Sequence, residues 1–354
     1  MRISSEHLER FVSALLQAAG ISSRDALITA AHLVSANLTG HDSHGVMRLL
    51  QYFRELDNGQ IVAGARVVVL NDWPTGAVID ARGVLGQVAG HDAMQLAIEK
   101  ARTAGMAAVT LRRANHSGRL GTYVEQAANS GMVGIAMANG GGGGQWVAPF
   151  GGRERRFSTN PIAIGAPSAG ESHHVLDMST SIAPEGKVRD CLQRDVQTPA
   201  GWLVDERGEP TTNPQDLYAD PGGALLPFGG PAGHKGSGLA FMVDVFAGGL
   251  SGQGCPSAPR KDADDGTGVF LMAIDVARFV PVADLQERVD AMAAFVRSSL
   301  PSTGFNEVLT PGEYEHRQRA LRMTDGIDLP EFVVEQLRQL ALRFHLSDHE
   351  VPFS

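Results

Sequence analysis

Six short apolar runs between residues 66 and 275 constrain the fold of this chain more than any other feature. Each run is rich in valine, isoleucine, leucine or alanine and is bounded by glycine, proline or polar residues, which is typical of a β-strand. The runs cover residues 67–70, 107–111, 133–138, 161–164, 175–177 and 269–275. Helical patterns lie between them at 87–105, 123–131 and 234–250. The middle of the chain is therefore predicted to be an α/β structure with several long loops.

Both ends of the chain have helical periodicity instead. Residues 4–53 contain an apolar stripe of one helix, followed by Ser22-x-x-Asp25, which resembles a capping box, and a second helix over 26–38 that ends before Gly40. Two further helices are predicted at 282–300 and 329–346. The expected division is a helical segment over 1–75 that packs with 281–354, and a central region over 76–280.

Composition excludes several classes of protein. With 354 residues, 43% of them hydrophobic and 19% charged, the chain is long enough to bury a large core. A formal charge of −9 argues against a general nucleic-acid binder. No apolar run approaches the roughly 20 residues of a membrane span, and the N-terminus does not read as a signal peptide, so we expect a cytoplasmic protein. The two cysteines, Cys191 and Cys255, lack the spacing of a zinc or redox motif.

The segment His41-Asp42-Ser43-His44-Gly45-Val46-Met47-Arg48 carries the richest chemistry. A helix is predicted to start at Asp42 or Ser43, run to Leu56 and end at Asn58-Gly59. On such a helix His44, Arg48 and Tyr52 would lie on one face. An imidazole exchanges protons near neutral pH, and a guanidinium grips a carboxylate through paired hydrogen bonds, a combination that suits a 2-hydroxy or 2-oxo acid. The alternative is a capping histidine and a solvated arginine.

A second candidate site follows the predicted strand at 107–111, in the segment from Arg113 to Gly121. At a junction between a strand and a helix, the backbone N–H groups at the start of the helix can bind an anion. Gly118 and Gly121 allow a close approach of the backbone, Arg119 can neutralise a phosphate, and His116 is a second acid or base. The alternative is a tight turn with a hydrogen-bonded histidine.

Two further segments have features of a phosphate or ribose site. Glycines bracket His234 and Lys235 before an apolar helix, and a helix N-terminus beside a cation suits phosphate. Asp177 and Ser179 follow a strand, where they can engage ribose hydroxyls or cap the next helix. The alternative for Lys235 is a side chain that only faces water, and the alternative for Asp177 and Ser179 is that they only cap the next helix.

The glycine run Gly140–Gly144 is not followed by Lys-Ser or Lys-Thr, and no Gly-x-Gly-x-x-Gly opens a helix anywhere in the chain. Neither a phosphate loop nor an ordinary Rossmann fingerprint is present. The run is interpreted as a surface loop, and any dinucleotide must be held by another fold.

Together these motifs resemble the malate/L-lactate/ureidoglycolate dehydrogenase family over nearly the whole chain. Leu225-Leu226-Pro227 and Pro311-Gly312-Glu313-Tyr314-Glu315 are most similar to its hydroxycarboxylate dehydrogenase B branch. The other segments that carry the resemblance are His41–Gly45, Asn115-His116-x-Gly118, Ala148–Gly152, Ser158–Pro161, Leu176–Ser181, Gly186-Lys187, Pro210–Pro214 and His234–Gly236.

The resemblance implies a non-Rossmann nucleotide-binding fold with a large mixed, mainly antiparallel sheet, packed helical termini and a homodimer. It implies hydride transfer between NAD(P)H and a 2-oxo acid, with NAD preferred as the cofactor and NADP as the alternative. His44 would be the proton donor, oriented by Ser43, with Arg48 as the carboxylate partner and His116 as a second polar group. The implied cofactor contacts are Gly118, Arg119, Leu120, Val175, Leu176, Asp177, Met178, Ser179, His234, Lys235, Gly312, Glu313, Tyr314 and Glu315.

The chain departs from the family pattern at three places. Arg113-Ala114 replaces an Asn-Ser or Asn-Ala pair, which adds a cation near the nucleotide or substrate. Lys187 replaces the aspartate of the imine reductases, which disfavours their mechanism. The glycine run Gly140–Gly144 lacks side chains where some relatives contact the nucleotide. Beside these departures, Arg153, Arg155 and Arg156 either bind a 2′-phosphate or face water.

Two other classes of function are weighed against the dehydrogenase. His41-x-x-His44 has a spacing compatible with a metal-dependent hydrolase or lyase, with His116 and Asp177 as further ligands, but it lacks the HExxH arrangement. No metal is expected. A non-catalytic nucleotide sensor is the third reading, and the His44/Arg48 pair argues against it.

Overall fold

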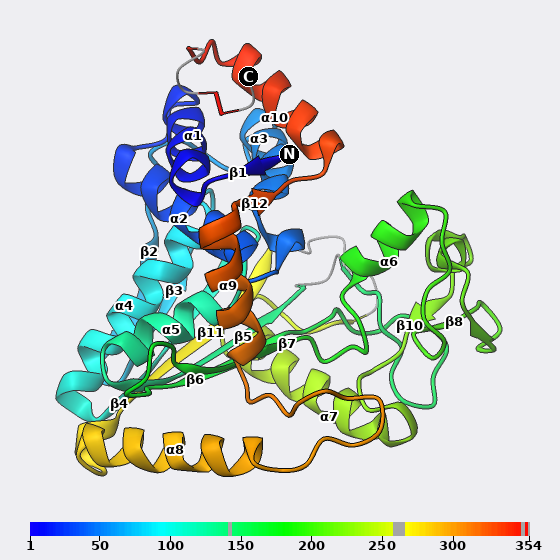
Figure 1. Cartoon of the computed structure of the whole chain (residues 1–354). Helices are drawn as coiled ribbons and strands as arrows, with labels where there is room; N and C mark the ends of the chain where they lie inside the picture. Colours follow the sequence, from blue (N-terminus) through cyan, green and yellow to red (C-terminus); the bar gives the residue numbers. More distant parts are fainter. Residues whose placement is uncertain (141–143, 258–265, 348–350, 353–354) are drawn as a thin grey trace.

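A computed structural model describes residues 1–140, 144–257, 266–347 and 351–352. A seven-stranded sheet forms its centre, with the strand order β2-β3-β4-β11-β5-β6-β7 (Figure 1). Neighbours β3 and β4 are parallel, and every other neighbouring pair in this sheet is antiparallel. Its strands are β2 (Val68–Trp73), β3 (Gly76–Asp80), β4 (Met106–Ala114), β5 (Met132–Asn139), β6 (Ile162–Ala166), β7 (His174–Met178) and β11 (Thr267–Asp275).

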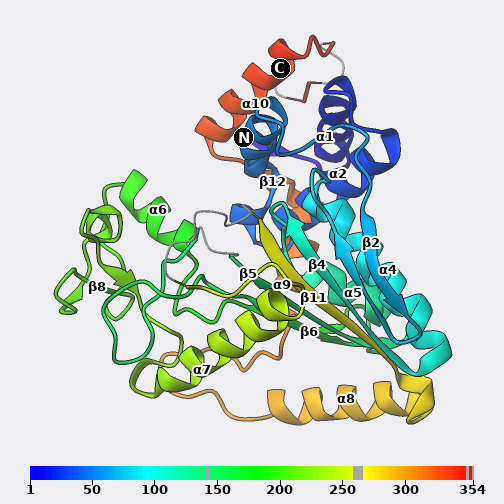
Figure 2. The ribbon, with the colours of Figure 1, turned by 180° about the vertical axis from the view of Figure 1, so that it is seen from behind.

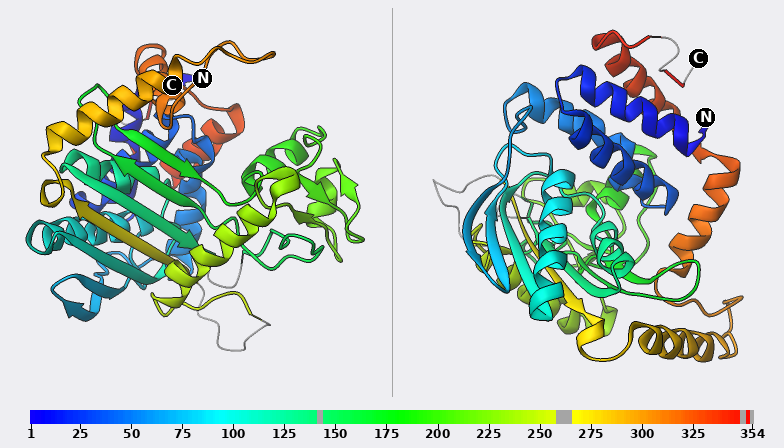
Figure 3. Two further views of the ribbon diagram at one scale, coloured as in Figure 1. Left: turned by 90° about the horizontal axis from the view of Figure 1, so that it is seen from below. Right: turned by 90° about the vertical axis from the view of Figure 1, so that its left-hand side faces the viewer.

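Helices α4 (Gly86–Ala104) and α5 (Gly121–Asn129) cover one face of this sheet (Figure 3). The buried stripe of α4 includes Ala93, Ala97 and Ala101, four residues apart, so the helix lies close to β4 and β11. On the opposite face, α7 (His234–Val243) continues into a π-helix, Asp244–Gly249, that packs on β5 and β11. Helix α8 (Val282–Arg297) is held beside the β6–β7 hairpin by Asp290, which accepts hydrogen bonds from Ser168 Oγ and Ala169 N.

The two ends of the chain form one helical layer. Strand β1 (Arg2–Ile3) pairs antiparallel with β12 (Ile327–Asp328), and α9 packs on α2 while α10 packs on α3 (Figures 1 and 2). The apolar stripes of α1, α2, α3 and α10 join the main hydrophobic core. The helices are α1 (Ser5–Ala18), α2 (Ser23–Leu38), α3 (Leu49–Asp57), α9 (Glu313–Asp325) and α10 (Glu331–Arg343).

A smaller lobe projects from the sheet between β7 and α7 (Figure 1). It contains α6 (Glu185–Gln193) and a sheet of the order β10-β8-β9, made of β8 (Leu203–Val204), β9 (Pro210–Thr211) and β10 (Ala224–Leu225). Val147, Val188, Leu203, Leu217 and Leu225 form a separate core there. This lobe places the N-terminal end of α6 against Ser43, since a Cβ on Gly186 would lie 3.5 Å from Cβ of Ser43.

The mixed, mainly antiparallel sheet and the packed helical termini confirm the expected fold class. All six predicted strands are present, and the predicted cap is formed because Ser22 Oγ accepts from Asp25 N at 3.2 Å. Helices α6 and α9, strand β3 and the two-residue strands β1, β8, β9, β10 and β12 were not predicted from the apolar pattern. Helix α9 buries none of its residues fully, so its sequence has no continuous apolar stripe to reveal it.

None of the helices in the described ranges combines the length and apolar character that a membrane crossing requires.

Candidate active site

The segment with His44 and Arg48 is not one helix. It forms two short 3₁₀ turns, Asp42–His44 and Val46–Arg48, before α3 begins at Leu49, which corrects the predicted start at Asp42 or Ser43. Gly45 separates the turns with extended backbone, and a Cβ there would collide with the side chain of Asn37. Asn37 Oδ1 in turn accepts from Val46 N at 2.9 Å. The close approach of Asn37 therefore breaks the helix and requires the glycine.

Asp42 anchors the same loop to both ends of the chain. Its Oδ1 accepts from Asn37 Nδ2 at 2.7 Å and from Arg322 Nη1 at 2.7 Å, while its Oδ2 accepts from Arg322 Nη2 at 3.1 Å. Arg322 is on α9 and also donates to the backbone oxygen of Asn37. This two-pronged contact fixes the loop that carries Ser43 and His44.

His44 and His116 stack against each other, with ring centroids 5.5 Å apart and ring planes 23° apart. Tyr52 Oη lies 2.8 Å from Nδ1 of His116 and accepts a hydrogen bond from Gln87 Nε2. The Tyr52 hydroxyl, itself held by Gln87, therefore fixes the orientation of the His116 ring through Nδ1 and leaves Nε2 for other contacts. Ser43 Oγ lies 3.1 Å from Nδ1 of His44. Each ring thus has its Nδ1 engaged.

Burial keeps both imidazoles neutral. Desolvation, with the nearby Arg48 charge as the second cause, lowers the pKa of His44 to about 3. The same two causes lower the pKa of His116 well below its ordinary value. A substrate carboxylate bound to Arg48 would cancel part of that charge and move both pKa values upward.

Arg48 is oriented by two contacts, Nε to the backbone oxygen of Ser43 at 2.6 Å and Nη1 to Gln51 Oε1 at 2.9 Å. Burial lowers its pKa. Among the residues that the structure describes, none accepts a hydrogen bond from its Nη2. That edge of the guanidinium is available to a carboxylate.

The junction from β4 to α5 holds His116 and the predicted phosphate-binding residues. Gly118 has φ +72°, and a Cβ there would collide with the ring of His32. Nε2 of His32 accepts from Arg119 N at 3.0 Å. The guanidinium of Arg119 is buried and contacts Glu125 at 2.8 Å and Asp177 at 3.7 Å. This placement gives no support to Arg119 as a phosphate ligand and makes it a partner of Asp177 instead.

Three of the four predicted cofactor segments converge on β7. Asp177 Oδ2 accepts from Gly121 N at 2.7 Å, and Val175 N donates to the backbone oxygen of Pro311 at 3.3 Å. Gly312, with φ +87°, lies so close to Val175 that a Cβ would be 3.0 Å from its nitrogen. Glu315 Oε1 is 3.4 Å from Nε2 of His41. The segments 118–121, 175–179 and 312–315 therefore adjoin the loop of His44.

The side chains of these segments differ in burial and in their hydrogen-bond partners. Burial raises the pKa of Asp177, whereas Glu313 accepts a hydrogen bond from Thr310 N, in the turn before α9, at 3.0 Å. Tyr314 is half-exposed near Gly40, and Leu120 is buried in the main core. The backbone and the carboxylates, more than the apolar side chains, are placed to meet a polar ligand.

The fourth segment is at the start of α7, where His234 and Lys235 are exposed. The ring of His234 packs edge-on against Phe150, with centroids 5.7 Å apart, and Ser237 Oγ accepts from Phe150 N at 3.1 Å. Phe228, six residues earlier, donates its N–H to the backbone oxygen of Thr180 at 2.9 Å. The chain before α7 is thereby attached to the segment that follows β7.

A donor set of this kind fits a nicotinamide dinucleotide. The first-turn amides of α7 lack intrahelical partners, as at any helix start, and suit a phosphate. Asp177 and Ser179 supply acceptors and a hydroxyl for ribose groups. The glycine run offers no evidence either way, because residues 141–143 are outside the described residues.

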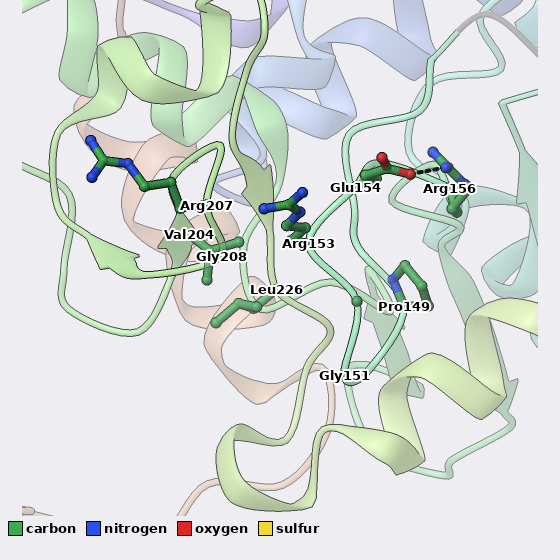
Figure 4. Close-up of a pocket in the computed structure, with 10 residues that line it drawn as sticks. Pro149, Gly151, Arg153, Glu154, Arg156, Val204, Arg207, Gly208 and Leu226 are labelled. Atoms are coloured by element: carbon green, nitrogen blue, oxygen red, sulfur yellow. Dashed lines mark hydrogen bonds and ion pairs between the residues drawn. The ribbon is translucent and has the colours of Figure 1, made fainter.

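Arg113, Arg153, Arg155 and Arg156 have different surroundings. Arg113 forms a two-pronged ion pair with Asp80. Arg155 donates to the backbone oxygens of Gly223 and Leu217 and lies over Trp146, so it supports the small lobe. Arg153 and Arg156 line a surface pocket of about 660 Å³ together with Arg207, and Arg156 pairs there with Glu154 (Figure 4).

A second cleft, of about 580 Å³, adjoins His116. Its walls include Gln51 and Glu55 of α3 and Arg113 and Asn115 of the β4–α5 junction. Asn115 Nδ2 donates to the backbone oxygens of Gln60 and Val84, at 3.2 and 2.9 Å, and so holds two walls together. The cleft has the size of a small-molecule site.

The metal-dependent alternative has no ligand set in the described ranges. No three histidine, cysteine, aspartate or glutamate side chains gather there in a way that could hold an ion. His41 faces Glu315, and Asp177 faces Arg119 and Gly121.

Sequence reasoning missed Gln87, Asn37 and Arg322. Gln87 is fully buried and reaches His116 through Tyr52, Asn37 shapes the break at Gly45, and Arg322 comes from α9. Gln87 and Arg322 act through long-range contacts that no local spacing reveals, whereas Asn37 contacts Asp42 and Val46, five and nine residues later. A polar glutamine among the apolar residues that open α4 is the one signal that the sequence contained.

Comparison with known proteins agrees with this geometry. The family model described as malate/L-lactate dehydrogenase matches residues 3–338. A malate dehydrogenase of Pyrococcus horikoshii is 36% identical over 97% of this chain and 95% of its own, and hydroxycarboxylate dehydrogenase B of Escherichia coli K12 is 34% identical over 93% and 90%.

Solved structures give the same result. The Pyrococcus horikoshii malate dehydrogenase superposes with a TM-score of 0.87 at 35% identity and covers 98% of this chain and 96% of its own. The sulfolactate dehydrogenase of Methanocaldococcus jannaschii has a TM-score of 0.88 at 33% identity and covers 99% of both chains. With its fold, its histidine pair and its arginine all in place, the chain belongs to the malate/L-lactate dehydrogenase family.

Proposed function

We propose that this protein is a nicotinamide-dependent 2-hydroxycarboxylate dehydrogenase whose reaction takes place between His44, His116 and Arg48. The observation that carries the proposal is the stacked histidine pair beside an arginine with one free edge. Family membership supports the class of reaction, oxidation of a 2-hydroxy acid and reduction of the 2-oxo acid.

The roles follow from the contacts of each group. Arg48 would hold the substrate carboxylate through its Nη2 edge, which orients the 2-oxo group toward the imidazoles. Bound nicotinamide would supply the hydride. As negative charge grows on the carbonyl oxygen, Nε2–H of His116 would stabilise it, and His44 would deliver the proton.

The low pKa of His44 fits both directions of the reaction. In the ligand-free protein the neutral ring is a base ready to take the proton of a 2-hydroxy acid. In the reduction direction, binding of an anionic 2-oxo acid to Arg48 offsets the guanidinium charge and favours uptake of the proton that His44 then delivers.

NAD is proposed as the cofactor, with contacts from Gly118, Leu120, Val175–Ser179, His234, Lys235 and Gly312–Glu315. The supporting observation is Asp177, because a carboxylate near a ribose favours free hydroxyls over a 2′-phosphate. NADP would be favoured instead if the pocket of Arg153 and Arg156 held a 2′-phosphate.

A homodimer in the cytoplasm is the proposed state. Large apolar side chains are exposed on α7, on α8 and just after α8, among them Phe241, Phe295 and Leu300, at 59%, 80% and 90% exposure. Exposed apolar groups of this size are typical of surfaces that a partner covers. Light scattering after size-exclusion chromatography would give twice the mass of the chain, and a monomer would contradict this part of the proposal.

The proposed function is tested by the loss of NADH absorbance with pyruvate, oxaloacetate, phenylpyruvate, hydroxyphenylpyruvate or oxalurate, with NADPH in parallel. Oxidation with at least one acid, unchanged by a chelator, is expected. No oxidation with any acid and either cofactor would overturn the proposal, and activity abolished by the chelator would favour the metal-dependent alternative.

A further inference from the structure

A row of polar side chains runs from Arg48 along α3 into the cleft beside His116. Arg48 Nη1 donates to Gln51 Oε1 at 2.9 Å, and Gln51 Nε2 donates to Glu55 Oε1 at 2.8 Å. The amide group of Gln51 thus spans the gap between Arg48 and Glu55. The row begins at the proposed carboxylate anchor and ends one side chain further along, so a ligand that reaches both ends must be longer than the carboxylate and its adjoining 2-oxo group.

Glu55, at the end of this row, has one carboxylate oxygen that accepts no hydrogen bond from the described residues. Its Oε2 is buried and has no hydrogen-bond partner among the described residues, although Glu55 lines the cleft. A buried carboxylate oxygen without a donor is costly to a protein. A ligand that enters the cleft with a hydroxyl or N–H group at its far end would satisfy it.

Glu55 is the one acidic side chain among the described residues that line this cleft. Of the two arginines that line it, Arg113 forms a two-pronged pair with Asp80, and Arg112 also lies 3.7 Å from the same carboxylate. Arg82 is exposed and therefore strongly screened by water. A second carboxylate placed directly against Glu55 would be repelled.

We propose that Glu55 is a specificity-determining residue and that the natural substrate is a 2-oxo or 2-hydroxy acid of about five to seven carbons whose far end carries a hydroxyl or N–H donor. Arg48 takes the carboxylate at C1, His44 and His116 face the oxygen at C2, and Glu55 accepts the distal hydrogen bond. The inference rests on the proposed function, because it uses Arg48 as the anchor of the acid.

The test compares three 2-oxo acids of matched length as NADH-dependent substrates. They are 6-hydroxy-2-oxohexanoate, with a distal hydroxyl, 2-oxoheptanoate, with an alkyl end, and 2-oxoadipate, with a distal carboxylate. We expect kcat/KM to be roughly 10- to 100-fold higher for the hydroxy acid than for the alkyl acid, as for a hydrogen bond to a charged group. The dicarboxylate is expected to be the poorest of the three.

Two variants attribute the preference to Glu55. In Glu55→Leu the preference for the hydroxyl end should disappear, and in Glu55→Gln the discrimination against 2-oxoadipate should disappear because the repelling charge is gone. Glu99→Gln is the matched control, since Glu99 also accepts from a glutamine four residues earlier, Gln95, at 2.9 Å, but on the exposed side of α4. That variant should keep the wild-type order.

Failure of the inference and failure of the proposed function give different results. If wild type reduces 2-oxo acids but prefers the dicarboxylate, shows no preference, or keeps its preference in Glu55→Leu, the role of Glu55 is overturned and the dehydrogenase stands. If no 2-oxo acid is reduced at all, the proposed function falls and this inference falls with it.

Discussion

At the scale of single residues, His44 gains its character from burial next to Arg48. Its pKa of about 3 means that the ring is neutral at pH 7 in the ligand-free protein. The sequence singled out His44, Arg48 and His116 because imidazole and guanidinium side chains are chemically distinctive, and the structure brings the two histidines together. It could not predict that Tyr52 and Gln87 orient the His116 ring, because that depends on packing between α3 and α4.

Replacement of His44 by alanine tests its role in proton transfer. We expect kcat for reduction of a 2-oxo acid to fall by about 10²- to 10⁴-fold, with KM changed far less, because the group acts mainly in the transition state. The measurement is steady-state oxidation of NADH. His7→Ala is the control, since His7 is exposed on α1. Equal kcat values in wild type and His44→Ala would contradict the assignment.

Replacement of Arg48 by lysine tests the carboxylate anchor. Lysine keeps the charge but loses the planar fork, so kcat/KM for 2-oxo acids should fall roughly 10- to 100-fold, mainly through KM. Reduction of ethyl pyruvate, which has no carboxylate, should change little. A similar loss for the acid and for the ester would mean that Arg48 supports the fold and does not bind substrate.

At the scale of elements, the site depends on a loop and not on a helix face. The spacing of His44, Arg48 and Tyr52 suggested one helical face, but the side chain of Asn37 occupies the space that a Cβ at position 45 would need, and the chain breaks there. Most of the strands were predictable because each is a short apolar run that the sheet buries; β2 is the exception, since Val68, Val69 and Leu70 are exposed. The break was not predictable because it depends on where the side chain of Asn37 lies, and α9 was not because it contacts a segment about 280 residues away.

Replacement of Arg322 by alanine tests the attachment of this loop to α9. Loss of its hydrogen bonds to Asp42 should destabilise the protein by about 1.5–3 kcal/mol and lower kcat, because the loop carries His44. Thermal unfolding and NADH oxidation would be measured together. Arg319→Ala, on the same helix with a single exposed contact to Ser35 at 3.3 Å, is the control. Identical behaviour of the two variants would refute the idea that α9 positions the loop.

At the scale of the whole molecule, the two ends of the chain close over the site that the sheet and the junction from β4 to α5 provide. β1 pairs with β12, and Arg343 of α10 forms an ion pair with Asp57 at the end of α3. Resemblance to a known family predicted this closure and the mainly antiparallel sheet. The helical patterns at the two ends, taken alone, indicated the elements but not their pairing, because pairing depends on contacts more than 280 residues apart.

Buried neutral histidines make the stability of the whole fold depend on pH. Burial lowers the pKa of His32 to about 3, as it does for His44. Between the unfolded value near 6.5 and the folded value, the unfolded chain binds a proton that the folded chain does not, so stability falls as the pH falls. Each such histidine contributes a loss of about 1.4 kcal/mol per pH unit.

Urea unfolding between pH 7 and pH 5 measures this effect. His32→Gln keeps an acceptor for Arg119 N but does not titrate, so the fall in stability should be shallower than in wild type. His7→Gln should follow the wild-type curve. Parallel curves for wild type and His32→Gln would show that His32 does not remain neutral in the folded protein.

The most direct test of the central claim follows the hydride itself. The protein would be supplied with NADH deuterated at C4 of the nicotinamide, once on each face, and with a 2-oxo acid, and the product would be analysed by proton NMR. The account predicts a 2-hydroxy acid with deuterium on C2 from one of the two labelled cofactors and none from the other. A product without deuterium on C2 from either cofactor, or no 2-hydroxy acid at all, would contradict it.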